Sequence, residues 1–262
     1  MSLPASSLSA LVLRHVEAGV CTLTLNNGDR FNALSEDMLT ALLVTLKEIA
    51  QTPEVRVVVL AAAGKAFCAG HDLRQMQANP SQQYYQHLFQ QCTKLMLAIQ
   101  QLPQPVIARV HGIATAAGCQ LVAMCDLAVA EENAKFAVSG INVGLFCSTP
   151  AVALSRNISR KQAMEMLLTG DFIDASTALQ RGLVNRVVPF AMLDTCIADL
   201  TASIVSKPVA AIAMGKQLFY KQLEMGVDAA YQLAGQTMAC NMMEDSAQKG
   251  VQAFIEKRHS KQ

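Results

Sequence analysis

Tryptophan is absent from this 262-residue chain, and aromatic residues make up only 5% of it. Proteins that bind single-stranded nucleic acid stack bases on such side chains. The chain also has no excess of positive charge, because 21 Lys and Arg residues and 20 Asp and Glu residues leave a net charge of +1. The sequence therefore predicts no nucleic-acid partner and no general attraction to an acidic membrane surface.

Long hydrophobic runs are also absent. The longest, VVVLAAAG at 57–64, has the length of a strand, whereas a membrane span needs ~18 apolar residues. We therefore expect no membrane span. Hydrophobic residues nevertheless make up 52% of the chain, and the mean hydropathy is +0.28. We expect the surplus apolar surface to be buried between subunits.

The cysteine pattern gives no sign of a disulfide framework. Eight cysteines are present, none in a CxxC pair, and most have apolar neighbours. This pattern is typical of free thiols in a reducing compartment. Residues 1–19 contain one Arg and no basic-then-apolar signal pattern, so neither export nor a transit peptide is predicted. We expect a cytoplasmic protein, with the mitochondrial matrix as the alternative for a eukaryotic source.

Several common catalytic motifs are missing. The chain has no GxGxxG or GxxxxGK[ST] phosphate loop, no GxSxG elbow and no HExxH, which argues against the nucleotide-binding, hydrolase and metalloprotease sites that those motifs form. His111, Cys119 and Cys125 are zinc-ligand types, but their spacing matches no common zinc site. The sequence therefore predicts no metal.

The order of the expected elements predicts an α/β fold. Strand patterns occur at 20–26, 55–61, 105–112 and 126–130, and helical spacing occurs at 35–50, 82–100 and 116–125. Strands that alternate with helices favour parallel pairing through crossover connections. From about residue 191 onward the strand signals stop and four helical patterns follow. We expect an α/β body at 1–190 and a helical section at 191–262.

Two stretches rich in small residues carry the strongest functional signal. GKAFCAGHDL (64–73) and HGIATAAGCQL (111–121) each run from an expected strand into an expected helix. Small residues let backbone N–H groups approach a ligand atom, and two such turns facing one point would form an oxyanion hole. Alternatively, the small residues serve only tight packing between strand and helix. The residues alone leave both interpretations open.

Three polar residues in these stretches each have a structural alternative. His71 is either a base or a donor through its backbone N–H alone, with its ring packed or solvated; we favour the second. Asp72 precedes an expected helix, so it is interpreted as a helix cap rather than a catalyst. Asp126, at the end of the second stretch, is also interpreted as structural.

Three motifs match a known family. AFCAGHDL, ARVHGIATAAGCQLVAMCDLAVA and MLLTGDFIDASTALQRGLVNRVVP, in this order and spacing, resemble the crotonase superfamily, which includes the enoyl-CoA hydratases. The resemblance extends from about residue 30 to residue 258. Details such as ATAAGCQL, NVGLFCSTP and FYKQL are most similar to one subgroup, the enoyl-CoA hydratase domain-containing 3 proteins.

The resemblance implies a crotonase-like spiral of β-β-α units with a helical C-terminal trimerisation region, assembled as a homotrimer or a homohexamer made of two trimers. It implies an acyl-CoA thioester as ligand, with no other cofactor. The backbone N–H groups of His71 and Ala117 would bind the thioester oxygen. The residues expected to line the substrate site are Arg30, Ala33, Leu34, Ala69, Gly70, His71, Asp72, Leu73, Ala116, Ala117 and Gly118. Lys257 would contact CoA phosphates, either in its own subunit or in a neighbouring one.

The chain departs from the family at two positions. Hydratases typically carry glutamates where this sequence has Gln120 and Gly140. A glutamine can orient water but cannot exchange its proton, so ordinary hydration should be weak, and restoring both carboxylates should restore it. Three functions remain open. They are enolate chemistry without the acids, such as decarboxylation of a malonyl-type CoA; weak hydration or isomerisation through His71, Cys147 or Ser148; and non-catalytic acyl-CoA binding or scaffolding.

Overall fold

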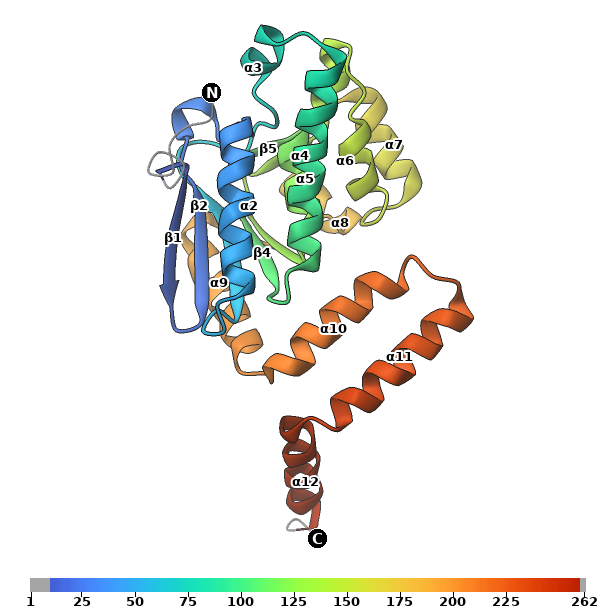
Figure 1. Ribbon diagram of the computed structural model, residues 1–262. Coiled ribbons are helices and arrows are strands. Elements are labelled where there is room, and N and C mark those ends of the chain that lie inside the picture. Colours follow the sequence, from blue (N-terminus) through green and yellow to red (C-terminus); the bar gives the residue numbers. More distant parts are fainter. Residues whose placement is uncertain (1–9, 260–262) are drawn as a thin grey trace.

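The computed structural model describes residues 10–259, with side chains to residue 256, and its centre is a six-stranded sheet (Figure 1). The strand order is β1-β2-β3-β4-β6-β9, and only the β1–β2 pair is antiparallel. The strands are β1 (Val12–Glu17), β2 (Val20–Leu25), β3 (Val57–Ala62), β4 (Val106–Val110), β6 (Leu127–Glu131) and β9 (Arg186–Val188). The predicted strands and their parallel pairing are confirmed; β1 and β9 had not been predicted.

A second sheet of three short strands lies beyond the first and positions the site. Its order is β5 (Ile113–Thr115), β7 (Lys135–Ala137) and β8 (Ile173–Asp174). β5 follows β4 after Gly112, whose φ is +63°. A side chain at Gly112 would lie 2.2 Å from the Lys65 carbonyl oxygen, so only glycine fits this turn. Each of β4 and β6 thus continues into a strand of the second sheet before a helix follows, which is the predicted β-β-α unit.

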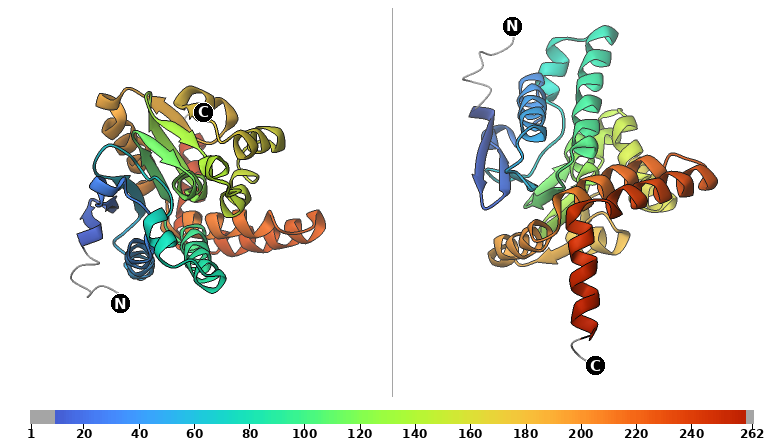
Figure 2. Two further views of the ribbon diagram at one scale, coloured as in Figure 1. Left: turned by 90° about the horizontal axis from the view of Figure 1, so that it is seen from above. Right: turned by 60° about the horizontal axis from the view of Figure 1, so that its bottom comes forward.

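Helices cover both faces of the main sheet (Figure 2). α2 (Glu36–Ala50), α4 (Gln82–Gln101) and α5 (Ala117–Met124) share one apolar core with the sheet, and α9 (Leu193–Val205) covers the other face. Ser35 caps the N-terminus of α2 as predicted, because its hydroxyl accepts from the Met38 N–H at 3.2 Å. Every residue of β3 is buried, as expected for a strand between two helical layers.

Seven shorter helices complete the described part of the body, and most of them lie at the end where the second sheet is found. They are the α-helices α3 (Leu73–Ala78), α6 (Ser148–Leu154), α7 (Arg160–Thr169) and α8 (Ala175–Arg181) and the short 3₁₀ helices η1 (Gly28–Arg30), η2 (Ser139–Val143) and η3 (Phe190–Met192). Asp72 precedes α3, and its carboxylate accepts from the N–H groups of Arg74 and Gln75. The prediction that Asp72 is a helix cap is therefore confirmed.

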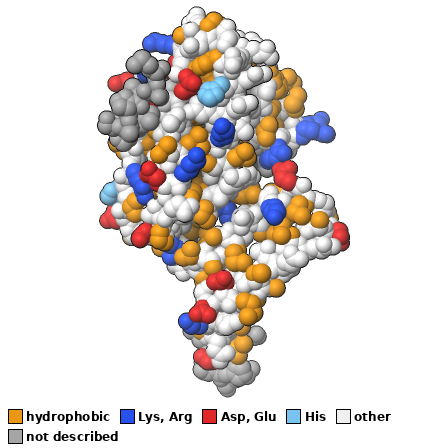
Figure 3. All heavy atoms as spheres, in the orientation of Figure 1, with side chains coloured by type: hydrophobic (Ala, Val, Ile, Leu, Met, Phe, Trp, Pro, Cys, Tyr) orange, Lys and Arg blue, Asp and Glu red, His pale blue; other side chains and the backbone are white. Residues whose placement is uncertain are grey.

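The last part of the chain projects from the body. α10 (Val209–Gln222) and α11 (Val227–Met242) form a hairpin, and α12 (Asp245–His259) extends from it (Figure 1). The four helices expected after residue 191 are thus present, but α9 packs on the sheet, α10 is bonded to the body through Lys216, and the projecting part consists of α11 and α12. Apolar side chains are exposed over these helices in the lower half of Figure 3. The division at residue 190 and the oligomerisation role remain predictions.

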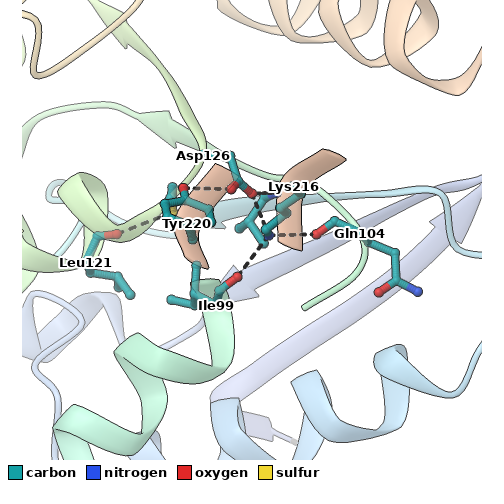
Figure 4. Close-up of polar contacts among 8 residues, drawn as sticks. Ile99, Gln104, Leu121, Asp126, Lys216 and Tyr220 are labelled. Carbon is teal, nitrogen blue, oxygen red and sulfur yellow. Dashed lines mark hydrogen bonds and ion pairs between the residues drawn. The ribbon is translucent and has the colours of Figure 1, made fainter. Parts of the chain in front are cut away.

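A buried ion pair fixes α10 to the body (Figure 4). The Lys216 ammonium donates to Asp126 Oδ2 at 2.7 Å and to the carbonyl oxygens of Ile99 and Gln104. The Tyr220 hydroxyl donates to Asp126 Oδ1 at 2.8 Å. Burial lowers the pKa of Lys216, and burial together with the Asp126 charge raises that of Tyr220. Asp126 is therefore structural, as predicted.

Within residues 10–259 no single helix is long and apolar enough to cross a membrane. One pair, Phe190–Val205 and Val209–Gln222, reaches the required length and composition only together, and it is bent by 103°. The first member of that pair contains α9, whose apolar side is packed on the sheet.

Candidate functional site

The two turns rich in small residues lie against each other. The Cys68 N–H donates to the Ile113 carbonyl at 3.1 Å, and the Thr115 N–H donates to the Cys68 carbonyl at 3.0 Å. A Cβ added at Gly118 would lie 2.1 Å from the Cys68 oxygen, and one at Gly70 would lie 2.9 Å from Ala116 Cβ. The small residues therefore allow the two backbones to touch, a contact that larger side chains would prevent.

This contact brings two unpaired backbone donors to one place. Ala117 is the first residue of α5, where an N–H has no acceptor within the helix. Ala116 has φ of 51° and ψ of −122°, a strained conformation that turns the chain into α5. Among residues 10–259, neither the Ala117 N–H nor the His71 N–H donates to a protein group. Two such donors can hold an oxyanion.

Both donors belong to residues that line a pocket of about 220 Å³. Its walls come from the turn at 69–73, from α3 and α4, from the start of α5, and from the segment that runs from η2 into α6. The lining residues are Ala69, His71, Leu73, Met76, Phe89, Ala116, Ala117, Ser139, Gly140, Val143, Leu145, Phe146, Cys147, Ser148, Thr149 and Pro150.

The residues predicted for the substrate site are gathered around this pocket, although not all line it. Ala69, His71, Leu73, Ala116, Ala117 and Gly140 line it. Leu34 is joined to the turn because its N–H donates to the Gly70 carbonyl at 2.7 Å. Arg30 pairs with Asp72 across 3.5 Å. Ala33, Gly70 and Gly118 lie beside these residues in the backbone. Lys257 belongs to α12, and its side chain lies outside the described residues.

Asn32 fixes the segment at residues 30–34 to the neighbouring backbone. This structural role had not been predicted from the sequence. It is fully buried, and its amide donates to the carbonyl oxygens of Ala63 and Ala66, each at 2.8 Å. Its side-chain oxygen accepts from the Asn27 N–H at 2.9 Å. Asn32 also has a φ of 52°, a left-handed conformation that asparagine tolerates. The signal available in the sequence was a single asparagine between the apolar residues of the stretch RFNAL.

The His71 ring is packed rather than solvated. Its Nδ1 lies 3.3 Å from the Leu34 carbonyl oxygen, and its ring meets the Phe89 ring edge-on at a centroid distance of 5.5 Å. Burial lowers the pKa of His71, so the imidazole is neutral near pH 7, and Nδ1 donates to Leu34. Nε2 is enclosed and has no partner among the described groups. The neutral His71 ring therefore forms part of the pocket wall.

The two positions where hydratases carry glutamates differ in what surrounds them. Gln120 is 5% exposed, and its side-chain oxygen has no partner among the described groups. It follows Ala117 by three residues, so both lie on one side of α5. Gly140 lines the pocket, but a Cβ there would lie 2.6 Å from the Leu145 carbonyl oxygen and 2.8 Å from Cys147 Sγ.

Other polar groups in the pocket are poor acid–base substitutes. Burial raises the pKa of the Cys147 thiol, so it remains protonated near pH 7. The Ser139 hydroxyl is bonded to that of Thr115 at 2.8 Å, and the Ser148 hydroxyl donates to the Phe146 carbonyl. Within the described residues, no group of three His, Cys, Asp or Glu side chains could hold a metal ion.

The pocket wall formed by Phe89, Val143, Leu145 and Phe146 had not been predicted. Val143, Leu145 and Phe146 are exposed apolar residues in the stretch NVGLFCSTP, which the sequence offered only as a mark of resemblance. Three apolar residues clustered in a surface segment are the signal that would have indicated a binding wall.

Comparison with known proteins agrees with the fold. The chain is 44% identical over 240 residues to the rat enoyl-CoA hydratase domain-containing protein 3, and the alignment covers 92% of this chain and 80% of the rat protein. A crystal structure of an enoyl-CoA hydratase from Mycobacterium smegmatis matches with a TM-score of 0.93 at 64% identity, covering 94% and 96% of the two chains. The human domain-containing protein 3 structure matches with a TM-score of 0.91 at 41% identity, covering 94% and 98%.

These comparisons confirm the crotonase fold and the subgroup resemblance, and they correct one expectation. The rat protein and its human counterpart are mitochondrial. The cytoplasmic location expected from the sequence is therefore wrong on this comparison; the weak charge pattern of residues 1–19 was too slight a basis for it. The sequence profile of the enoyl-CoA hydratase/isomerase family matches residues 15–262, and the chain belongs to that family.

Proposed function

We propose that the pocket binds an acyl-CoA thioester whose carbonyl oxygen accepts from the backbone N–H groups of His71 and Ala117. The observation that carries this proposal is that these two N–H groups have no protein acceptor among the described residues and belong to one pocket. Charge that develops on the thioester oxygen would be stabilised there without reorganisation. Arg30 would line the CoA channel, and Lys257 from α12 of a neighbouring subunit would contact the CoA phosphates.

The chemistry we propose is stabilisation of a thioester enolate, as in a hydratase or isomerase of weak ordinary hydration activity. No Asp or Glu side chain lines the pocket in the described part of the chain, and general acid–base groups contribute ~10²–10⁴-fold in rate. The same observation favours one second candidate, a non-catalytic acyl-CoA-binding protein. The two candidate functions differ in whether the protein converts the bound thioester to a product.

The Ala117→Val substitution tests the oxyanion hole. Ala117 is 2% exposed, and a branched side chain there would push the thioester oxygen away from the N–H group. We expect acetoacetyl-CoA, measured by calorimetry, to bind at least about tenfold more weakly, the effect of one lost hydrogen bond of ~1.4 kcal/mol.

The matched control is Ala117→Gly, which keeps the N–H and adds no bulk, so its affinity should stay close to that of the unmodified chain. Normal binding by a folded Ala117→Val variant would show that the turn is misassigned. No detectable heat from the unmodified chain at millimolar acetyl-CoA or acetoacetyl-CoA would refute acyl-CoA binding altogether.

We also propose that the chain assembles as a homotrimer or as two trimers. Large apolar side chains are exposed along α10 and α11, among them Phe219, Leu223, Tyr231 and Met238. Their burial against other subunits would account for the apolar composition. Light scattering at micromolar concentration should give three or six times the mass of 28.1 kDa; a stable monomer would contradict the proposal.

A further inference from the structure

α3 forms part of the pocket wall although none of its six residues is buried. Leu73 and Met76 of this helix line the pocket, and Leu73 is 57% exposed. The neighbouring helices α2 and α4 each bury several apolar side chains in the core. Burial of apolar surface therefore stabilises the position of α3 much less than that of α2 or α4. The position of α3 depends correspondingly more on its polar contacts.

Gln75 of α3 makes two hydrogen bonds to Glu36, the first residue of α2. The Gln75 Nε2 donates to Glu36 Oε2 at 3.0 Å, and the Gln75 Oε1 accepts from the Glu36 N–H at 3.1 Å. The Glu36 carboxylate also accepts from the Tyr84 hydroxyl of α4 at 3.4 Å. On the other side of α3, the Tyr85 hydroxyl of α4 donates to the Met76 carbonyl oxygen at 3.2 Å. The Glu36–Gln75 pair thus joins α3 to α2, and through the Glu36 carboxylate to α4.

The N–H group of His71 is held by a different contact. The Gly70 carbonyl oxygen accepts from the Leu34 N–H at 2.7 Å. The Gly70 carbonyl and the His71 N–H belong to one trans peptide, so they point in opposite directions. Leu34 therefore fixes the direction of the His71 N–H through the same peptide, and Ala117 lies on α5. Displacing α3 would move the wall residues Leu73 and Met76 while leaving both N–H donors in place.

We propose that Gln75 is a positioning residue for ligand binding: its two hydrogen bonds to Glu36 hold α3, and with it Leu73 and Met76, against the bound thioester. The proposal rests on the acyl-CoA site proposed above and adds the residue that fixes one wall of it. Breaking the Glu36–Gln75 pair lowers affinity because the wall loses its contact with the ligand. Stabilisation of charge on the thioester oxygen is unaffected because its donors are held separately.

The Gln75→Glu substitution tests this by placing a second carboxyl group of the same size against Glu36. Two carboxylates in contact repel, so the pKa of at least one of them rises. Burial and the Glu36 charge raise the pKa of the neighbouring Tyr84 to about 12, so its hydroxyl stays uncharged. Asp72, which pairs with Arg30 across 3.5 Å, adds further negative charge nearby. A shared proton keeps a hydrogen bond below the raised pKa, whereas repulsion displaces α3 as the pH rises through it.

We expect Gln75→Glu to bind acetoacetyl-CoA at least about fivefold more weakly than the unmodified chain at about pH 8, and within about twofold of it at about pH 5. Calorimetry on the full chain at both pH values measures the ratio. Gln77→Glu is the matched control, because Gln77 is exposed and lies two residues further along α3, on another side of the helix. Its affinity should equal that of the unmodified chain at both pH values.

Two further readouts separate positioning from a general loss of structure. Combining Glu36→Gln with Gln75→Glu exchanges the amide and the carboxylate, and we expect this double variant to regain the affinity of the unmodified chain at about pH 8. The absorbance of the enolate of acetoacetyl-CoA, measured at saturation, reports charge held by the two N–H donors. We expect it to be unchanged in Gln75→Glu and lowered in Ala117→Val. Absence of rescue, or an enolate signal lost in Gln75→Glu, would overturn the proposal.

Failure of this proposal is distinguishable from failure of the proposed function. Hydrogen exchange in the ligand-free chain reports on α3 directly, and we expect faster exchange of residues 73–78 in Gln75→Glu than in Gln77→Glu at about pH 8. Equal exchange, or equal affinity of the two variants for acetoacetyl-CoA, would refute the role of Gln75 while the acyl-CoA site stands. If the unmodified chain binds no acetoacetyl-CoA at millimolar concentration, the acyl-CoA site is refuted and this proposal with it.

Discussion

Replacing Gln120 with glutamate should raise the rate of crotonyl-CoA hydration by at least ~10²-fold over that of the unmodified chain, the lower end of what a general acid–base group contributes. Gln120 is buried on the side of α5 that carries Ala117, and its side-chain oxygen has no partner among the described groups. A carboxyl group in that place would have a raised pKa because burial disfavours its charged form, which suits proton exchange near neutral pH. Loss of the enoyl absorbance measures the rate.

Gln104→Glu is the matched control. Gln104 is also a buried glutamine with an unpartnered side-chain oxygen, but it lies between α4 and β4, where its amide donates to the Ile49 carbonyl oxygen, rather than on α5 with Ala117. We expect no gain in hydration from it. Rapid hydration by the unmodified chain would contradict our interpretation of Gln120, because some other residue would then be the acid–base group.

The second large effect concerns stability. Lys216→Met should lower the free energy of unfolding by about 3–5 kcal/mol, because it leaves the Asp126 carboxylate buried without its ion-pair partner. Lys216 is 7% and Asp126 15% exposed, so water replaces little of the lost contact. The carbonyl oxygens of Ile99 and Gln104 also lose a donor. Denaturation in urea at a fixed protein concentration measures the change.

Lys221→Met on the same helix is the control, since Lys221 is exposed and such substitutions usually change stability by less than about 0.5 kcal/mol. If Lys216→Met unfolds at the same urea concentration as Lys221→Met, the network contributes nothing to stability. Because Lys216 and Tyr220 lie on α10, the Lys216→Met chain should also expose α10 to proteolysis before the body.

The sequence predicted what depends on local chemistry. The periodic runs gave α2, α4 and the parallel strands, and the small residues around Gly70 and Gly118 indicated a close backbone contact, which the structure shows. It did not predict the pocket wall or the link between α10 and Asp126, because these bring together residues far apart in the chain, such as Lys216 and Asp126. Nothing in the run AMGKQLFYKQ distinguishes Lys216 from Lys221.

Gly140 limits how the second acid could be regained. The sequence suggests that restoring glutamate at both 120 and 140 would restore hydration, but a side chain at 140 would strike the Leu145 carbonyl oxygen and Cys147 Sγ. The oxygen belongs to the backbone, so it moves only if residues 140–147 take another path. The structure therefore opposes the double variant while leaving Gln120→Glu open.

Positions 120 and 140 therefore differ in how readily a mutation could restore the glutamate that hydratases carry there. A single substitution of glutamine by glutamate at 120 requires no change in the backbone, because the two side chains have nearly the same shape. At 140, any side chain collides with the loop backbone. A single substitution to glutamate would therefore distort the loop, and selection would act against it. A lineage with this loop can regain one acid by a point mutation, whereas the other requires the loop to change first.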